Sequence, residues 1–433
     1  LKQCWSIDYA PKDEYRLMLL QGQVAMATGR IQAAREHFEA ARAYAREERQ
    51  RITADLWLAR VLNMLDALEA EEAILDGLLP LAEVLEDPLP LAEALYLKGN
   101  LYFPRGDFAT SRAYHTRALE QARQGGDVRT EIQALSGLGD AHYAQGQMHS
   151  TLELFDHCVT LCRTHGHADL EASNLFMLGT ARIYANQTAA ALADCFDAAE
   201  LGKRVGNRRA EVVARLTAGW ILISQGDPQG ADEQVKQALE VARGLGSWRF
   251  EAFLLESRAR VELITGQVAE ARASIGRAWQ LVEQHGMQAF IGPWVLGTRA
   301  LLEEDPEARS ATLKQGEALL DAGCVGHNGY RFLISAAEVC LLDHRPDMAR
   351  HYAERLTQLM AAEPCAWGEH HRSLIEAHAD WLDTVEKSVA KSAGASVEKS
   401  VEERALETLR ALWLRGEAAG LLMTLPRLAA SRH

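Results

Sequence analysis

The sequence predicts an all-α fold, in which about ten antiparallel helix pairs stack into one right-handed superhelical solenoid. Two series of turn-type residues, each with a 40-residue step and 20 positions out of phase with one another, support this fold. The apolar residues between the turns follow helical spacing. Two chain reversals per period require two helices of similar length, so the repeating unit is a helical hairpin.

The first series of turns marks the middle of each hairpin. Glycine adopts a left-handed conformation at a helix end without the steric cost of a Cβ atom, asparagine tolerates it next best, and proline prevents a helix from continuing. The first series comprises Gly106, Gly146, Asn186, Gly226, Gly266, Pro306 and Pro346. The second series, which ends each hairpin, comprises Gly126, Gly166, Gly206, Gly246, Gly286 and Gly326.

Small residues recur at one fixed place in each helix of the hairpin. Seven residues before the first-series turn stand Gly99, Gly139, Gly179, Gly219 and Ala259. Twelve residues after it stand Ala118, Cys158, Ala198, Ala238, Ala278 and Ala318. Because small facing residues let two helix backbones approach closely, we expect both sets to lie between paired helices.

This pattern resembles the tetratricopeptide repeat (TPR), in which a small residue, a turn, a bulky residue and an alanine occupy fixed positions. The resemblance covers about residues 13–360. The usual TPR has a period of about 34 residues, so the 40-residue period implies longer helices.

Residues 384–402 interrupt the array with low-complexity sequence. They contain VEKSV twice, beginning at Val385 and Val397, close to position 386 where the next first-series turn is due. An intra-repeat turn is where a solenoid best tolerates extra residues. We therefore expect TPR-like repeats over 1–383, an insertion over 384–402 that follows a helix ending at Trp381-Leu382, and a last repeat helix with a capping helix over 403–433.

The stretch 324–367 carries a more specific resemblance. Its matching residues are His327-Asn328, Tyr330-Arg331-Phe332, the segment 349–354, Glu363-Pro364 and Trp367. It resembles the distal repeats of bacterial proteins that join a class III adenylate or guanylate cyclase domain, a P-loop ATPase of the STAND type and a C-terminal helical-repeat region. The resemblance implies that the chain is that repeat region, with ATPase and cyclase domains as intramolecular partners. A first residue that is Leu also suggests a piece of a longer protein.

The sequence carries no catalytic motif. The P-loop pattern GxxxxGK[ST], the GxSxG elbow, GxGxxG and HExxH are all missing. Clusters of potential metal ligands around Cys158 and around His371 do not have the spacing of a metal site. We therefore expect no catalytic residue, no metal and no cofactor in this chain.

Composition restricts the partners and the compartment. The 46 Lys and Arg residues against 60 Asp and Glu leave a net charge of −14, which disfavours direct nucleic-acid binding. No window approaches 18 uninterrupted apolar residues, so neither a membrane span nor a secretory signal is expected. The seven cysteines lack CxxC spacing. We expect a cytoplasmic protein with free thiols.

The remaining candidate site is a binding surface. In repeats of this type the first helix of each hairpin lines a concave groove, where interleaved rings and polar groups suit a protein or peptide partner. The groove positions are Tyr96, Asn100, Phe103, Asp140, Tyr143, Phe176, Trp220 and Arg260, and a secondary candidate site comprises His327, Asn328, Tyr330 and Arg331. The groove rings should then be partly exposed. The alternative is that they pack against neighbouring helices.

These observations lead to a functional hypothesis. The chain is expected to be a non-catalytic protein-interaction and sensor module that regulates an attached or associated signalling ATPase or nucleotide cyclase. Two alternatives remain open: an inducer-binding sensor domain of a STAND transcription regulator, and a free-standing TPR assembly scaffold.

Overall fold

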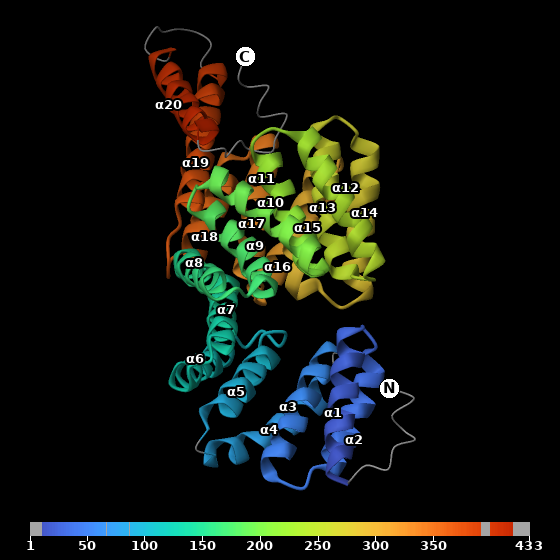
Figure 1. Cartoon of the computed structure of the whole chain (residues 1–433). Coiled ribbons are helices and arrows are strands. Elements are labelled where there is room, and N and C mark those ends of the chain that lie inside the picture. Colours follow the sequence, from blue (N-terminus) through green and yellow to red (C-terminus); the bar gives the residue numbers. More distant parts are fainter. Residues whose placement is uncertain (1–10, 66, 86, 391–398, 419–433) are drawn as a thin grey trace. The chain divides into compact units, whose positions relative to one another are not determined.

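The computed structural model describes residues 11–65, 67–85, 87–390 and 399–418, and these ranges contain helices and no strands (Figure 1). The all-α class is confirmed. In chain order the helices are α1 (Pro11–Ala27), α2 (Ile31–Tyr44), α3 (Glu48–Met64), α4 (Leu68–Val84), α5 (Pro88–Tyr102), α6 (Phe108–Gly125), α7 (Val128–Ala144), α8 (Met148–His165), α9 (Ala168–Tyr184), α10 (Thr188–Val205), α11 (Arg208–Ser224), α12 (Pro228–Gly244), α13 (Trp248–Ile264), α14 (Val268–Gln284), α15 (Gln288–Leu302), α16 (Pro306–Asp321), α17 (Gly326–Leu342), α18 (Pro346–Leu359), α19 (Ala366–Ala390) and α20 (Lys399–Ala418).

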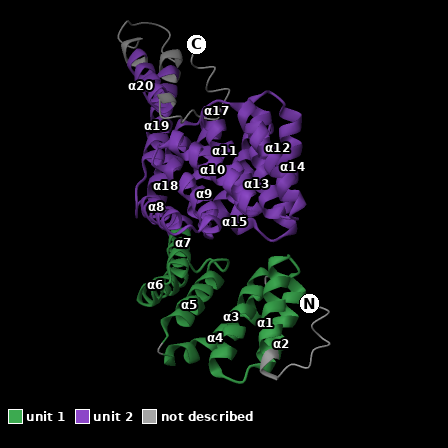
Figure 2. Ribbon diagram, viewed as in Figure 1, with its two compact units in different colours: residues 1–141 green, residues 142–433 purple. Residues whose placement is uncertain are grey.

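The helices group into two compact units, residues 1–141 and 142–433, whereas the sequence suggested one continuous array (Figure 2). In the first unit, buried Phe38 and Leu75 anchor separate apolar clusters between successive helices. In the second unit, a large cluster around Tyr184, Phe332 and Trp367 joins helices from α8 to α19. Each unit therefore has its own core.

The turns fall where the 40-residue period places them. Left-handed φ angles occur at Gly106 (76°), Gly146 (79°) and Asn186 (59°), so glycine and its asparagine substitute serve the same purpose. Pro306 and Pro346 are instead the first residues of α16 and α18, a position that suits their fixed φ. The helical hairpins predicted from the first series are confirmed.

Gly326, the last glycine of the second series, is an exception. The left-handed residue before α17 is Gly323, with φ of 98°, and Gly326 is the first residue of α17. A Cβ atom on Gly326 would lie 2.7 Å from the backbone nitrogen of Gly146, so this position needs glycine for close approach and not for a turn. The expected reversal at Gly326 is therefore displaced by three residues.

Helix α17 also departs from the regular stacking. It packs against α15 and α18 and hardly touches α16, although in the preceding hairpins α13 and α15 pack against the helix before them. A Cβ atom on Gly297 of α15 would lie 3.0 Å from the Cβ of Ser335, so the two helices approach closely there. All residues of α17 except Arg331 and Leu342 are buried. Helix α17 is thus a core helix of the second unit.

The small-residue series shows the same displacement. Ala118, Cys158, Ala198, Ala238 and Ala278 are completely buried, as predicted. In α16, however, Ala318 is exposed, and Gly316 is the buried small residue, close to the ring of Phe332. The buried small residue in α16 therefore lies two positions before the predicted one, where the ring of Phe332 from α17 approaches.

The C-terminal helices differ in one respect from the expectation. Helix α19 continues to Ala390, past Trp381-Leu382, because the first VEKSV copy contains neither glycine nor proline to stop it. Helix α20 contains the expected partner segment 405–414. Residues 391–398 and nearly all of the expected capping helix, 417–430, lie outside the described residues.

The buried alanines allow a test of the hairpin register. Ala198→Leu or Ala238→Leu should overpack a contact that has no free space and lower the free energy of unfolding by about 1–3 kcal/mol. Ala190→Leu, at an exposed position of α10, is the matched control. Urea denaturation of the three variants should separate them, and equal stability of all three would show that the register is wrong.

Candidate functional site

The eight predicted groove residues are divided between the two units. Tyr96, Asn100, Phe103 and Asp140 lie in the first unit, where all four are half-buried. The ring of Tyr96 lies against His115, and Phe103 meets Phe108 edge-on. A binding role for these four residues stays a prediction.

In the second unit, Phe176 and Trp220 are buried, with 8% and 7% of their surface exposed. The indole nitrogen of Trp220 donates a hydrogen bond to the Ser257 hydroxyl at 3.0 Å. The expected exposure of these two rings is therefore wrong. Trp220 is buried because two side chains of α17, His327 and Arg331, contact its ring.

Helix α17 brings the groove residues and the secondary candidates together. The ring of His327 lies 5.2 Å from Tyr143, 5.3 Å from Trp220, 5.0 Å from Trp294 and 5.8 Å from Tyr184, measured between ring centroids. Five helices supply these rings. With two further residues they form what we call the central cluster: Tyr143, Tyr184, Trp220, Trp294, His327, Arg331 and Trp367.

Arg331 lies among three tryptophans of the central cluster. Its guanidinium carbon is 5.3 Å from the ring centroid of Trp220, 5.6 Å from Trp294 and 5.4 Å from Trp367. Such cation–π contacts are favourable, more so when the cation is desolvated. Among the described residues no carboxylate forms an ion pair with this guanidinium, and its Nε is buried without a hydrogen-bond partner.

His327 is buried and neutral, because burial, reinforced by the charge of Arg331, holds its pKa well below its usual range. Its Nδ1 shares a hydrogen bond with the hydroxyl of Tyr184, and burial raises the pKa of Tyr184, so the hydroxyl keeps its proton. In the tautomer in which that hydroxyl donates to Nδ1, the ring carries its one hydrogen on Nε2. This nitrogen is buried and has no partner in the described part of the chain.

Another donor without a partner lies in the same cluster. Trp294 is 1% exposed, and its Nε1, which can only donate, has no acceptor among the described residues. Trp294 lies 4.7 Å from Trp220 between ring centroids. The central cluster is therefore rich in hydrogen-bond donors and short of acceptors.

A second polar group of side chains follows the same face of α17. Arg260, a predicted groove residue, donates to Glu256 at 2.5 Å and to Ser335 of α17 at 2.8 Å. Glu338 is 1% exposed, and neither of its carboxyl oxygens has a hydrogen-bond partner among the described residues. Burial raises the pKa of Glu338 to about 7, although the nearby charge of Arg260 opposes the shift.

The remaining secondary candidates fasten α17 in place. The Nδ2 of Asn328 donates to the carbonyl oxygen of Phe290 at 2.5 Å. The hydroxyl of Tyr330 donates to the carbonyl oxygen of Gly146 at 2.8 Å. Both residues are buried, so neither offers a surface to a large partner.

Contacts between distant segments close the second unit around α17. The carboxylate of Glu363, which lies between α18 and α19, accepts hydrogen bonds from the backbone nitrogen of Ser150 at 2.8 Å and from its hydroxyl at 2.6 Å. Ser150 is in the first turn of α8, where the helix dipole favours a negative charge. We call these two bonds and the bond from Tyr330 to Gly146 the closing contacts.

Sequence reasoning missed several residues of this region. The spacing of Glu256 and Arg260, four apart, is a usable signal for their ion pair. The sequence of α17 contains only His327, Arg331 and Glu338 as ionisable groups apart from Tyr330 and Cys340, and a helix that is apolar nearly all round is buried. Trp294 and Tyr184 are not on the positions expected to face a groove, and no local signal places them in the cluster.

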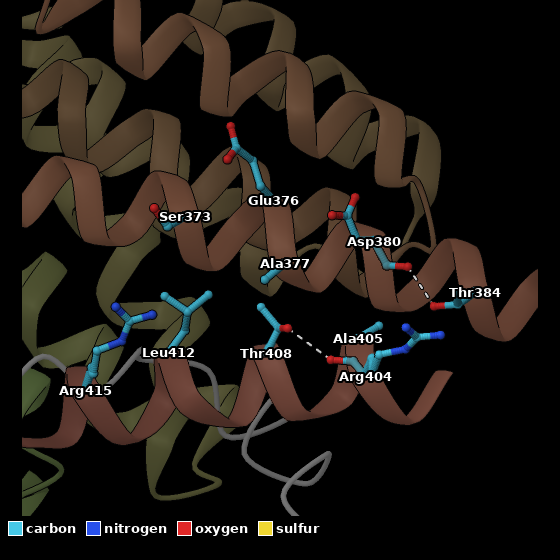
Figure 3. Close-up of a pocket in the computed structure, with 10 residues that line it drawn as sticks. All are labelled: Ser373, Glu376, Ala377, Asp380, Thr384, Arg404, Ala405, Thr408, Leu412 and Arg415. Carbon is cyan, nitrogen blue, oxygen red and sulfur yellow. Dashed lines mark hydrogen bonds between the residues drawn. The ribbon is translucent and has the colours of Figure 1, made fainter. Parts of the chain in front are cut away.

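A cleft of about 610 Å³ lies between α19 and α20 (Figure 3). Its acids are already paired, Glu376 with Arg372 and Asp380 with Arg350, each at 2.7 Å. None of its lining side chains has a buried polar atom without a partner among the described residues. The cleft is therefore a weaker candidate than the central cluster.

Within the described residues, no three His, Cys, Asp or Glu side chains are grouped so that they could hold a metal ion. Over the same residues, none of the helices combines the length and the apolar character that crossing a membrane requires.

Known structures share this fold. A Rap protein complexed with Competence and Sporulation Factor is 14% identical, with a TM-score of 0.63 over 81% of this chain and 98% of that chain. The apo form of the quorum sensor NprR from B. thuringiensis is 16% identical, with a TM-score of 0.57 over 81% and 98%. Aspartyl phosphate phosphatase F from Bacillus subtilis is 12% identical, with a TM-score of 0.53 over 82% and 95%.

At these identities the likeness concerns the fold, which is a TPR-like helical repeat. No protein-family model matches the sequence, and neither does any curated protein.

The burial of Trp220 changes the expected effect of its removal. Trp220→Ala should leave a cavity beside Trp294 and remove the hydrogen bond to Ser257, and so lower the free energy of unfolding by about 3–5 kcal/mol. Trp248→Ala, which removes a half-buried ring stacked on His285, should cost less. Chemical denaturation measures both. If the Trp220→Ala variant were as stable as the parent, Trp220 would not be a core residue, and the prediction that it lines an open groove would stand again.

Glu338 should make stability depend on pH. Its folded-state pKa is about 7, above the ordinary value of 4.5, so the unfolded state loses its proton first as pH rises. The free energy of unfolding should therefore fall between pH 4.5 and 7, by up to about 3 kcal/mol from this group. Denaturation at both ends of that range should show a smaller fall for Glu338→Gln. Glu354→Gln, at an exposed site on α18, should keep the parent's slope.

Proposed function

We propose that this chain is a non-catalytic sensor module that regulates an attached or associated signalling ATPase or nucleotide cyclase. The observation that carries the proposal is the central cluster, in which buried donors lack partners inside a closed helical unit. Polar groups that violate the rules of a stable core are expected at functional or strained sites. The cellular setting that we propose is the cytoplasm.

The closing contacts supply a way to transmit a signal. Glu363 and Tyr330 link segments that are 213 and 184 residues apart along the chain. A ligand that changes the packing of α17 changes these contacts at the same time. The module then has two arrangements, closed and loosened, and a ligand shifts the equilibrium between them by its difference in affinity.

Two of the proteins with a similar fold support a binding role. The Rap protein of similar fold is complexed with Competence and Sporulation Factor, and NprR is a quorum sensor. We propose that a protein or peptide partner, if it binds the first unit, uses Tyr96, Asn100, Phe103 and Asp140. The central cluster, which is buried inside the second unit, suits a smaller ligand.

Burial of Trp220 also favours one alternative, the inducer-binding sensor domain of a STAND transcription regulator. An enclosed cluster admits a small inducer more readily than a folded partner. The two proposals differ in the domains attached to the repeats, an ATPase with a cyclase in one and an ATPase with a DNA-binding domain in the other. A free-standing scaffold has neither.

The test is nucleotide turnover by the product of the complete reading frame. Glu363→Gln removes the charge from the closing contacts and should change basal ATP hydrolysis or cyclic-nucleotide formation about 5-fold or more. Glu354→Gln, an exposed substitution on α18, should leave turnover unchanged. The present chain alone should show neither activity.

Three results would contradict this proposal. Unchanged turnover in Glu363→Gln, with faster hydrogen exchange in α8 to show that the contact is lost, removes the regulatory role. If the complete reading frame encodes no ATPase or cyclase, and the chain also binds no such enzyme, then the proposed regulatory target is wrong. Turnover by the purified chain itself removes the non-catalytic assignment.

A further inference from the structure

We infer that the central cluster is a binding site for a small organic oxyanion, with a carboxylate or phosphate group held by Arg331, His327 and Trp294. The inference rests on the proposed sensor function and names the class of ligand that the same cluster takes. It is carried by the hydrogen-bonding balance of the cluster and by the charge of Arg331.

The first step is the donor balance. Three nitrogens, Arg331 Nε, His327 Nε2 and Trp294 Nε1, are buried without a hydrogen-bond partner among the described residues, and those of Arg331 and Trp294 can only donate. They belong to one compact group, since the His327 ring lies 5.0 Å from the Trp294 ring and the Arg331 guanidinium 5.6 Å from it. Buried donors without a partner are rare in folded proteins, so these nitrogens indicate an acceptor that the chain does not supply.

The second step is the charge. Arg331 is the ionic group that acts on both His327 and Tyr184, and no carboxylate influences either of them. His327 stays neutral, so the cluster carries a net positive charge. The faces of Trp220, Trp294 and Trp367 stabilise a guanidinium but cannot neutralise it. Water could satisfy the donors, whereas an anion would also neutralise the charge.

The third step is access and size. Arg331 retains partial exposure, although its neighbours His327 and Asn328 on α17 are buried. The exposed part of Arg331 marks the side from which a ligand would approach the cluster, and the surrounding rings leave no room for a folded partner. A planar carboxylate or a phosphate matches the fork of a guanidinium, and the indole faces suit a small organic body behind the head group.

The experiment uses this chain and two simple probes, sodium acetate and sodium phosphate, each titrated at constant ionic strength. Thermal melting and calorimetry should show saturable binding of at least one probe, and the preferred probe identifies the head group. Arg331→Gln should weaken that binding about 10-fold or more, because the charge-assisted bonds are lost. Arg277→Gln, which removes an exposed charge on α14, should bind as the parent does.

Trp294→Phe keeps the test decisive if Arg331→Gln does not fold. It retains an aromatic ring and removes the Nε1 donor, so binding should weaken about 5-fold while the cation–π contact persists. No saturable binding of either probe to the parent overturns the inference. Equal binding by the parent and both cluster variants also overturns it, since the anion is then bound elsewhere.

A third titration separates this inference from the proposed function. Tetramethylammonium chloride in place of the anions should have no saturable effect, and binding of that cation alone would overturn the oxyanion class while leaving a sensor role intact. Anion binding that depends on Arg331 but leaves nucleotide turnover of the complete protein unchanged would support the site and remove the sensor function.

Discussion

The close approach of α17 to its neighbours is the constraint on which the second unit depends. Glycine at 326 allows the first residue of α17 to touch Gly146, and glycine at 297 allows α15 to approach Ser335. Once α17 lies inside, its polar side chains must find partners there. Asn328 and Tyr330 donate hydrogen bonds to backbone carbonyl oxygens, and Ser335 accepts one from Arg260. These bonds hold the second unit closed.

The hairpins could be predicted from the sequence because they depend on local rules. A left-handed residue ends a helix, and glycine or asparagine stands at such positions wherever the period requires it, as at Gly106 and Asn186. The position of α17 could not be predicted in this way. Gly326 has the spacing of a turn glycine, but its role is close approach to a residue 180 positions earlier, which only the folded chain reveals.

The candidate site was predicted in two halves that the sequence does not connect. Trp220 and Arg260 follow from the groove positions, and His327 and Arg331 from the resemblance of the distal segment. Their meeting, and the burial of Trp220, follow from the displaced helix. The groove positions assume that consecutive first helices line an open concave wall, and that assumption fails where one of those helices moves inward and fills the space.

Arg331 and Glu338, two ionisable residues of α17, differ in how the protein can tolerate their charges. Arg331 and Glu338 are seven residues apart and lie on one face of the helix, with Ser335 between them. A buried carboxyl group can take up a proton, and the raised pKa of Glu338 shows that this occurs near neutral pH. A guanidinium has no such escape, because it stays protonated in proteins. The unsatisfied charge that remains on α17 is therefore positive, which is why an anion and not a cation completes the central cluster.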